Sequence, residues 1–214
     1  MRSDTDGFGR DDISKQINVS RETFERIDAV LACLDDWGSR MNLMGPAERG
    51  SIWRRHVYDS LQLLQFLPPD AKVVDLGSGG GFPALPLACA LGATGGHVTM
   101  VETVGKKARF LQAAVDAADL SATVRQGRAE NVGDIAADFV TARALAPLPK
   151  LLEYASPWLL RGGVGFFHKG ERWKEELTSA SAKWTFASEA IPSISGGAGI
   201  ILKVAEVVRE ESQD

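Results

Sequence analysis

Residues 73–82 read VVDLGSGGGF, and this stretch decides the fold class of the chain. Two valines lead into Asp75, and four glycines follow within residues 77–81. A glycine-rich turn between an apolar strand and a helix-forming run is typical of a ligand-binding loop in an α/β protein. Glycine permits positive φ and lets a ligand approach the backbone closely. A tight turn from strand to helix, with no ligand, is the structural alternative.

The spacing of the glycines narrows the kind of ligand. A dinucleotide fingerprint needs G-x-G-x-x-G, and counting from Gly77 and Gly79 puts Phe82 at the third glycine position. A P-loop needs Lys followed by Ser or Thr, and no such pair closes this loop. The pattern is instead D-x-G-x-G-x-G, formed by Asp75, Gly77, Gly79 and Gly81. It resembles the first motif of S-adenosylmethionine-dependent methyltransferases, in which the acid suits the ammonium group of the cofactor.

After residue 70 the chain alternates between strand-type and helical runs. The strand-type runs are 71–77, 97–102, 121–127, 137–143 and 162–170, and the helical runs are 82–91, 105–120 and 148–160. This alternation predicts an α/β fold with a mostly parallel, doubly wound sheet. The last two strand-type runs, 183–191 and 199–208, have no helix between them, so they predict an antiparallel hairpin at the edge of the sheet.

The first third of the chain differs, because no strand-type run precedes residue 71. An apolar stripe at helical spacing follows Ser20, and a second helical run ends at Pro68. We expect a flexible polar tail at residues 1–12, an N-terminal helical cap at 13–69 and a methyltransferase domain at 70–210, with the cap and the domain forming one compact unit.

Composition excludes several classes of protein. The chain has 214 residues, is 44% hydrophobic and carries a formal net charge of -4, which suits one globular domain rather than a basic nucleic-acid coat. No apolar leader and no run of about 18 apolar residues is present, so we expect a cytoplasmic protein with no membrane span. Cys33 and Cys89 lie in apolar runs outside any C-x-x-C pair, which predicts free buried thiols and no metal site.

Acidic residues also lie at the end of the next strand-type run and just after the one that follows it. The run HVTMVE ends in Glu102, where a carboxylate can accept both hydroxyls of a ribose. The alternative is an acid favoured by the dipole of the following helix. The run GRAEN at 127–131 brings Ala129 and Glu130 to the rim where an adenine would lie.

Five sequence motifs together resemble one family. They are RHVYDSL at 55–61, DLGSGGGFPALPLA at 75–88, GRAEN at 127–131, TARA at 141–144 and HKG at 168–170. They resemble the small-subunit ribosomal RNA guanine-N7 methyltransferase family, also called glucose-inhibited division protein B, and the resemblance extends over residues 20–207. It implies a Rossmann-like methyltransferase fold with an N-terminal helical extension, S-adenosylmethionine as cofactor and a guanine of 16S rRNA as substrate. By the same resemblance, the cofactor contacts include Gly77, Phe82, Ala129, Glu130 and Arg143.

The chemistry implied by this resemblance needs no general base. Guanine N7 carries a lone pair and no proton, so in-line positioning of the methyl group is the main requirement. Arginine is the usual partner of the O6 and N7 edge of guanine, and Arg143 follows a predicted strand near the methyl end of the cofactor. We therefore expect Arg143 to be the catalytic residue, with an ion pair to a nearby carboxylate as the structural alternative.

RNA binding must come from local positive charge, because the net charge is negative. The expected substrate-binding residues, from the cap and from the loop after the fifth strand, are Arg54, Arg55, His56, Lys169 and Arg172. For His56, the alternative is a packing histidine bonded to Asp59 or Asp75. We expect the small ribosomal subunit as partner, no obligatory protein partner and a monomer. A methyltransferase for a small metabolite or a protein, and a non-enzymatic cofactor sensor, are the competing functions.

Overall fold

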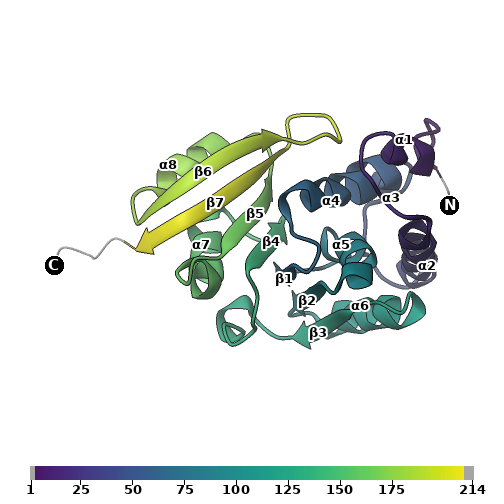
Figure 1. Cartoon of the computed structure of the whole chain (residues 1–214), viewed down its shortest axis with the longest axis horizontal. Coiled ribbons are helices and arrows are strands. Elements are labelled where there is room, and N and C mark those ends of the chain that lie inside the picture. Colours follow the sequence, from purple (N-terminus) through teal and green to yellow (C-terminus); the bar gives the residue numbers. More distant parts are fainter. Residues whose placement is uncertain (1–2, 210–214) are drawn as a thin grey trace.

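The computed structural model describes residues 3–209, apart from the side chains of residues 46 and 47. It contains a seven-stranded sheet in the order β3-β2-β1-β4-β5-β7-β6 (Figure 1). The strands are β1 Lys72–Leu76, β2 His97–Glu102, β3 Ala122–Gln126, β4 Phe139–Arg143, β5 Val164–Lys169, β6 Trp184–Pro192 and β7 Ile200–Arg209. The first five are parallel, and β6 and β7 form an antiparallel hairpin beside β5. The predicted α/β fold and the predicted edge hairpin are both confirmed.

Helices cover both faces of this sheet. The four helices of the sheet domain are α5 Ala84–Leu91, α6 Gly105–Ala117, α7 Leu148–Leu159 and α8 Trp173–Ala180. Successive residues of a strand point to opposite faces, so Val73 joins a core with α5 and α6, whereas Val74 joins a core with α7 and α8. After the exposed Lys72, both faces of β1 are buried, so the rest of its sequence is an apolar run interrupted by Asp75.

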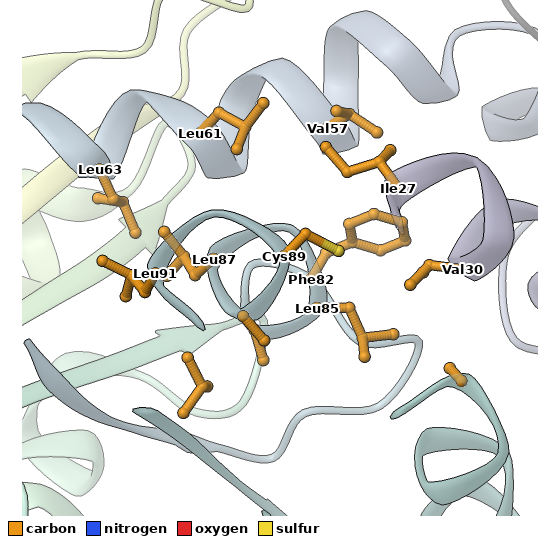
Figure 2. Close-up of a cluster of buried hydrophobic side chains, with 14 of the residues drawn as sticks. Ile27, Val30, Val57, Leu61, Leu63, Phe82, Leu85, Leu87, Cys89 and Leu91 are labelled. Carbon is orange, nitrogen blue, oxygen red and sulfur yellow. The ribbon is translucent and has the colours of Figure 1, made fainter. Parts of the chain in front are cut away.

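The N-terminal helical cap packs on the α5 and α6 side. It consists of α1 Arg10–Ser14, α2 Arg21–Gly38, α3 Pro46–Arg49, a π-helical turn η1 Trp53–Tyr58, α4 Asp59–Leu61 and a 3₁₀ turn η2 Gln62–Phe66. Figure 2 shows Ile27 from α2 and Leu61 from α4 facing Leu87 and Cys89 of α5. The cap and the sheet domain therefore share one hydrophobic core.

The N-terminal segment differs from the expected flexible tail. Residues 3–9 form a loop closed by an isolated bridge between Ser3 and Gly9, and the side chains of Asp4 and Phe8 are buried. The Asp4 carboxylate accepts hydrogen bonds from the backbone N–H groups of Trp53 and Arg54, at 2.8 and 2.9 Å. These N–H groups begin a helical segment, where backbone donors need acceptors from outside the helix, so a buried acid stabilises them. The polar composition of this segment gave no sign of the buried acid. Residues 1–2 of the expected tail lie outside the part of the chain that the structure describes.

A short helix between the fifth and sixth strands is the other departure from the prediction. α8 lies between β5 and β6, where no helix was expected, and Ala180 is its only buried residue. One buried position leaves almost no periodic apolar signal in the sequence.

Neither cysteine forms a disulfide bond. Cys33 and Cys89 are both free, and Cys89 is the more deeply buried of the two. Burial raises the pKa of both thiols, that of Cys89 to about 12. Within residues 3–209, no group of acidic, histidine and cysteine side chains is arranged to hold a metal ion. None of the helices in that range is long and apolar enough to cross a lipid bilayer.

Candidate active site

The strand order places the predicted site residues at one edge of the sheet. From β1 the chain moves outward to β2 and β3 and then returns to β4 on the other side of β1. Ligands of such sheets bind at the carboxyl ends of the strands where this reversal occurs. The glycine loop, Glu102, Arg143 and Lys169 all lie at the carboxyl ends of their strands. The structure therefore brings together residues from β1, β2, β4 and β5.

Two glycines of the loop are required by their surroundings. Gly77 has φ +70° and Gly81 has φ +87°, a region that residues with a side chain rarely adopt. A Cβ atom at Gly77 would lie 2.6 Å from Cδ1 of Leu145, a residue of the loop after β4. A Cβ atom at Gly81 would overlap the side chain of Leu85 on α5. The loop therefore packs tightly against the loop after β4 on one side and against its own helix on the other.

Glu102 joins the glycine loop to the start of α6. Its side chain is buried, with 5% of its surface exposed. One carboxylate oxygen accepts from the backbone N–H of Gly79 at 2.8 Å, and the other accepts from that of Val104 at 2.7 Å. The hydroxyl of Thr103 also donates to this carboxylate, at 3.4 Å. A carboxylate has about four acceptor positions, so it can hold these three groups and still accept from a hydroxyl of a ligand.

Asp75 is the most deeply buried acid at this edge, with 1% exposed surface. One oxygen accepts from the hydroxyl of Thr141 at 2.7 Å, whereas Oδ2 has no hydrogen-bond partner among the described residues. Burial raises the pKa of Asp75 to about 6, although the nearby hydroxyls of Ser78 and Thr141 oppose this rise. A buried acceptor without a partner calls for an explanation, and a bound cation or donor supplies one.

The two residues predicted at the adenine rim have different surroundings. Both belong to a 3₁₀ turn, η4 Ala129–Asn131, that directly follows β3. Ala129 is buried in the core on the α7 side, whereas the side chain of Glu130 is exposed. The backbone N–H of Gly127 donates to the carbonyl of Glu102 at 3.0 Å, which ties this turn to the end of β2.

Arg143 leaves the end of β4 and contacts the helical cap. Its Nη1 donates to the backbone carbonyl of Arg55 at 3.2 Å, and its Nη2 donates to Nδ1 of His56. Nη1 also lies 3.7 Å from Oδ2 of Asp59. Burial lowers the pKa of Arg143 and Asp59 opposes this shift. The alternative of an ion pair is therefore observed, together with two further contacts that fix the guanidinium against the cap.

His56 is a neutral partner of Arg143. Burial, and then the charge of Arg143, lowers its pKa to about 3. Its Nδ1 faces Arg143, and its Nε2 has no partner in the part of the chain that the structure describes. Its ring centroid lies 5.0 Å from that of Phe82, the residue that closes the glycine loop. The alternative, a bond from His56 to Asp59 or Asp75, is absent between these described residues, and Arg143 is the partner of Nδ1 instead.

A cleft of about 430 Å³ lies beside this cluster. It is bounded by the cap, by the ends of β4 and β5, and by the loop at residues 193–199 that joins β6 to β7. The predicted residues that line it are Arg55, His56, Arg143 and Lys169. Unpredicted lining residues are Asp59, His168, Ser193 and Ser195, of which Asp59 and His168 had a signal, as members of the motifs RHVYDSL and HKG.

Three of the predicted RNA contacts differ from one another in the partners of their side chains. Arg54 is not among the described residues that line the cleft, since its guanidinium lies 3.9 Å from the ring centroid of Phe8 and 3.2 Å from Asp6. The ammonium of Lys169 donates to Oε2 of Glu176 on α8 at 2.7 Å and to a backbone carbonyl of the loop after β4. Arg172 is exposed and lines a neighbouring hollow of about 330 Å³.

Comparison with known proteins identifies the family. Residues 23–200 match the family model described as GidB, rRNA small subunit methyltransferase G. The chain is 59% identical over 192 residues to ribosomal RNA small subunit methyltransferase G of Hyphomonas neptunium, which covers 90% of this chain and 92% of that protein. The chain belongs to the rRNA small subunit methyltransferase G family. The protein of that name from Rhodospirillum rubrum is 44% identical over 90% of this chain and 95% of its own length.

Solved structures resemble this methyltransferase in fold alone. Fibrillarin in its complex with Nop5p superposes with a TM-score of 0.54 at 15% identity, covering 70% of this chain and 79% of that one. TYW2 of M. jannaschii in complex with AdoMet superposes with a TM-score of 0.53 at 17% identity, covering 72% of this chain and 76% of that one. The family model matches from residue 23 onward, so the N-terminal loop that holds Asp4 lies outside the matched residues.

Proposed function

We propose that this chain methylates N7 of a guanine in 16S rRNA of the small ribosomal subunit, with S-adenosylmethionine as the methyl donor. The observation that carries the proposal is the position of Arg143. Its guanidinium lies at the end of β4 in the wall of a 430 Å³ cleft, and its Cζ is 5.8 Å from the ring centroid of Phe82 in the glycine loop. A base in the cleft would therefore lie next to a cofactor held by that loop.

The residues around the glycine loop fit S-adenosylmethionine. The unpaired Oδ2 of Asp75 suits the ammonium of its amino-acid portion, directly or through water. The carboxylate of Glu102 suits the two ribose hydroxyls, and the positive φ of Gly77 lets the ligand approach the backbone. We assign Gly79, Gly81, Phe82, Ala129 and Glu130 to the same cofactor site, as loop and rim residues. TYW2 of M. jannaschii, which shares the fold, was solved with AdoMet.

Bound S-adenosylmethionine supplies a methyl group on a positively charged sulfur. Guanine N7 attacks with a lone pair and loses no proton, so the chain needs no general base. The work left to the protein is to hold the base in line with the methyl group. Arg143 can donate to guanine O6, because only two of its five N–H groups have partners among the described residues. Asp59, 3.7 Å away, offsets its charge, so the donor does not repel the positive charge that moves onto the purine.

RNA would approach over the exposed arginines at the mouth of the cleft. Arg55 lines the cleft and Arg172 lines the adjoining hollow, and both side chains are exposed. Lys169 and Arg54 already have acidic partners within the chain, so we assign them a smaller share of the RNA contacts. The buried His56, with an unpartnered Nε2, is assigned to the base rather than to phosphate. We further propose that the enzyme acts as a monomer in the cytoplasm, where its ribosomal substrate is found.

Mass spectrometry of nucleosides from 16S rRNA tests this function. RNA from cells that lack the gene should lose one 7-methylguanosine, and the purified chain with S-adenosylmethionine should restore it. Retention of every 7-methylguanosine in the deletion strain would refute the proposal. Methyl transfer to small metabolites or proteins, without any dependence on ribosomal particles, would favour the competing enzyme class. Cofactor binding without turnover on any RNA would favour a sensor.

A further inference from the structure

The loop at residues 193–199 forms one wall of the cleft although it belongs to the far edge of the sheet. It connects β6 to β7 and reads SISGGAG. In Figure 1 the tip of this hairpin extends toward α4 of the cap. The contact is direct, because the backbone N–H of Ile194 donates to Oε1 of Gln62 at 3.1 Å. Two segments more than 130 positions apart in the sequence therefore meet beside the cleft.

Asp59 is the centre of this meeting point. Its Oδ1 accepts hydrogen bonds from Nε2 of Gln62 at 2.7 Å, from the hydroxyl of Ser195 at 3.1 Å and from the hydroxyl of Ser193. Its Oδ2 lies 3.4 Å from Nε2 of His168 and 3.7 Å from Nη1 of Arg143. With 7% of its surface exposed, Asp59 is too buried for water to replace these partners readily.

The two oxygens of Asp59 thus face two different kinds of partner. Oδ1 faces neutral donors, two of which come from the loop. Oδ2 faces Arg143 and His168, whose side chain is 8% exposed, and desolvation lowers the pKa of this histidine. Among the described residues within ion-pair distance, the charge of Asp59 is therefore balanced mainly by Arg143. Any movement of the loop that shifts Asp59 also changes the electrostatic field at Arg143.

We propose that Asp59 is a positioning residue that couples closure of the loop at 193–199 to the placement of Arg143. Through Ser193 and Ser195 it holds the loop against the cap as a wall of the guanine cleft. Through Oδ2 it holds the guanidinium that faces the base. This inference rests on the function proposed above. It predicts that the loop and Arg143 act as one unit and that neither Asp59 nor the loop serines matter to cofactor binding.

Two variants test separately the contact of Asp59 with the loop and its contact with Arg143. The double variant Ser193→Ala/Ser195→Ala removes the loop contacts on a partly exposed surface, so its folding should be preserved. Asp59→Asn keeps the size of the side chain and removes its charge. Ser179→Ala is the matched control, since Ser179 is exposed on α8 and donates only within its own helix, to the carbonyl of Glu175.

The first measurement is methylation kinetics on small ribosomal subunits, with calorimetry of S-adenosylmethionine. We expect Asp59→Asn to lower kcat by about tenfold or more and the serine variant to raise KM for the subunit by about fivefold. Cofactor affinity should stay within about twofold, and Ser179→Ala should match wild type. The variant that combines Asp59→Asn with both serine substitutions should lose less kcat/KM than the product of the two separate fold-losses in kcat/KM, because the effects of coupled residues are not additive. Additive effects, or a parallel loss of cofactor affinity, would overturn the proposal.

The second measurement is hydrogen exchange, which does not depend on activity. In the serine variant the backbone amide of Ile194 should exchange about tenfold faster, whereas that of Leu202 in β7 should not change. Unchanged exchange at Ile194 would overturn the role of the serines. A wild-type enzyme that makes no 7-methylguanosine would refute the proposed function instead, and the exchange result would still decide whether Asp59 holds the loop.

Discussion

The carboxylate of Glu102 accepts a hydrogen bond from the backbone N–H of Gly79 at 2.8 Å. The end of β2 is thereby joined to the loop that follows β1, at the edge where the strand order reverses. One buried acid therefore shapes the glycine loop and also offers acceptor positions for a ribose. The same contact explains why a structural role and a binding role for Glu102 do not exclude each other.

Substitutions at Glu102 should separate these two roles. Glu102→Ala should weaken binding of S-adenosylmethionine by about tenfold or more, because charge-assisted hydrogen bonds to the ribose are lost. Glu102→Gln keeps an acceptor for the Gly79 N–H and should lose less thermal stability than the alanine variant while losing similar affinity. Titration calorimetry and thermal melts give both quantities. Unchanged affinity in Glu102→Ala would remove Glu102 from the cofactor site.

Gly77→Ala should disrupt the loop through a single steric contact. The added Cβ meets Leu145 at 2.6 Å, in addition to the strain of φ +70°. Gly162→Ala is the control for strain alone. Its φ is +89°, and apart from its neighbours in the chain no atom lies within 4 Å of the position of an added Cβ. We expect Gly162→Ala to cost about 1 kcal/mol of stability and Gly77→Ala to cost more. In the Gly77→Ala background, Leu145→Ala should recover part of the difference in urea unfolding; no recovery would mean that the Leu145 contact is not the cause.

Asp75→Asn should stabilise the ligand-free protein in a pH-dependent way. The folded pKa of about 6 lies above the ordinary value of 3.8, so the native protein favours the protonated acid. The protonated side chain of Asp75 stabilises the native protein fully below pH 3.8, and this contribution is lost as the pH rises through 6. The gain from Asp75→Asn should therefore be larger at pH 7.5 than at pH 5, up to about 3 kcal/mol. Melting curves at both pH values measure it, and an equal gain at both would contradict the burial of a charge.

The same Asp75→Asn variant should bind S-adenosylmethionine more weakly. An amide cannot offer the charged acceptor that suits the ammonium of the cofactor. We expect a loss of affinity of about tenfold at pH 7.5, measured by calorimetry. A variant that is more stable and binds equally well would show that the unpaired Oδ2 faces no part of the ligand.

Arg143→Lys should be nearly as inactive as Arg143→Ala. A lysine cannot donate at once to the carbonyl of Arg55 and to Nδ1 of His56, since the two contacts use different nitrogens of one planar group. We expect kcat to fall by about tenfold or more in both variants, with cofactor affinity much less affected. The activities of the variants must be compared at an equal folded fraction, which circular dichroism measures. If residual activity simply tracks the folded fraction, Arg143 is structural.

Asp4→Ala should destabilise the helical cap. The variant leaves the backbone N–H groups of Trp53 and Arg54 without their acceptor, as in the loss of a helix N-cap. We expect a loss of about 1 to 2 kcal/mol in urea unfolding. Asp11→Ala, at an exposed position of α1, is the matched control and should change stability little. Equal effects of the two substitutions would argue against a capping role.

Local patterns in the sequence predicted most of the sheet domain. The apolar run before Asp75, the glycines after it and the alternation of strands with helices depend on residues close together in the chain. The convergence of Glu102, Arg143 and the glycine loop also followed, because the carboxyl ends of parallel strands share one edge. α8 escaped prediction because it buries one residue only, and Asp4 because its partners lie about 50 positions away.

By itself, the sequence determined the α/β fold, the glycine loop, the acid after β2 and membership of an rRNA methyltransferase family. Only the tertiary structure decided which partners the polar side chains take. It paired His56 with Arg143, and Asp59 with two serines of a distant hairpin. The physical reason is that these pairings depend on the order of β4, β5 and β7 and on the packing of the cap against them. No periodic pattern along the chain records that order, since side-chain hydrogen bonds form between whichever groups the fold brings within about 3 Å.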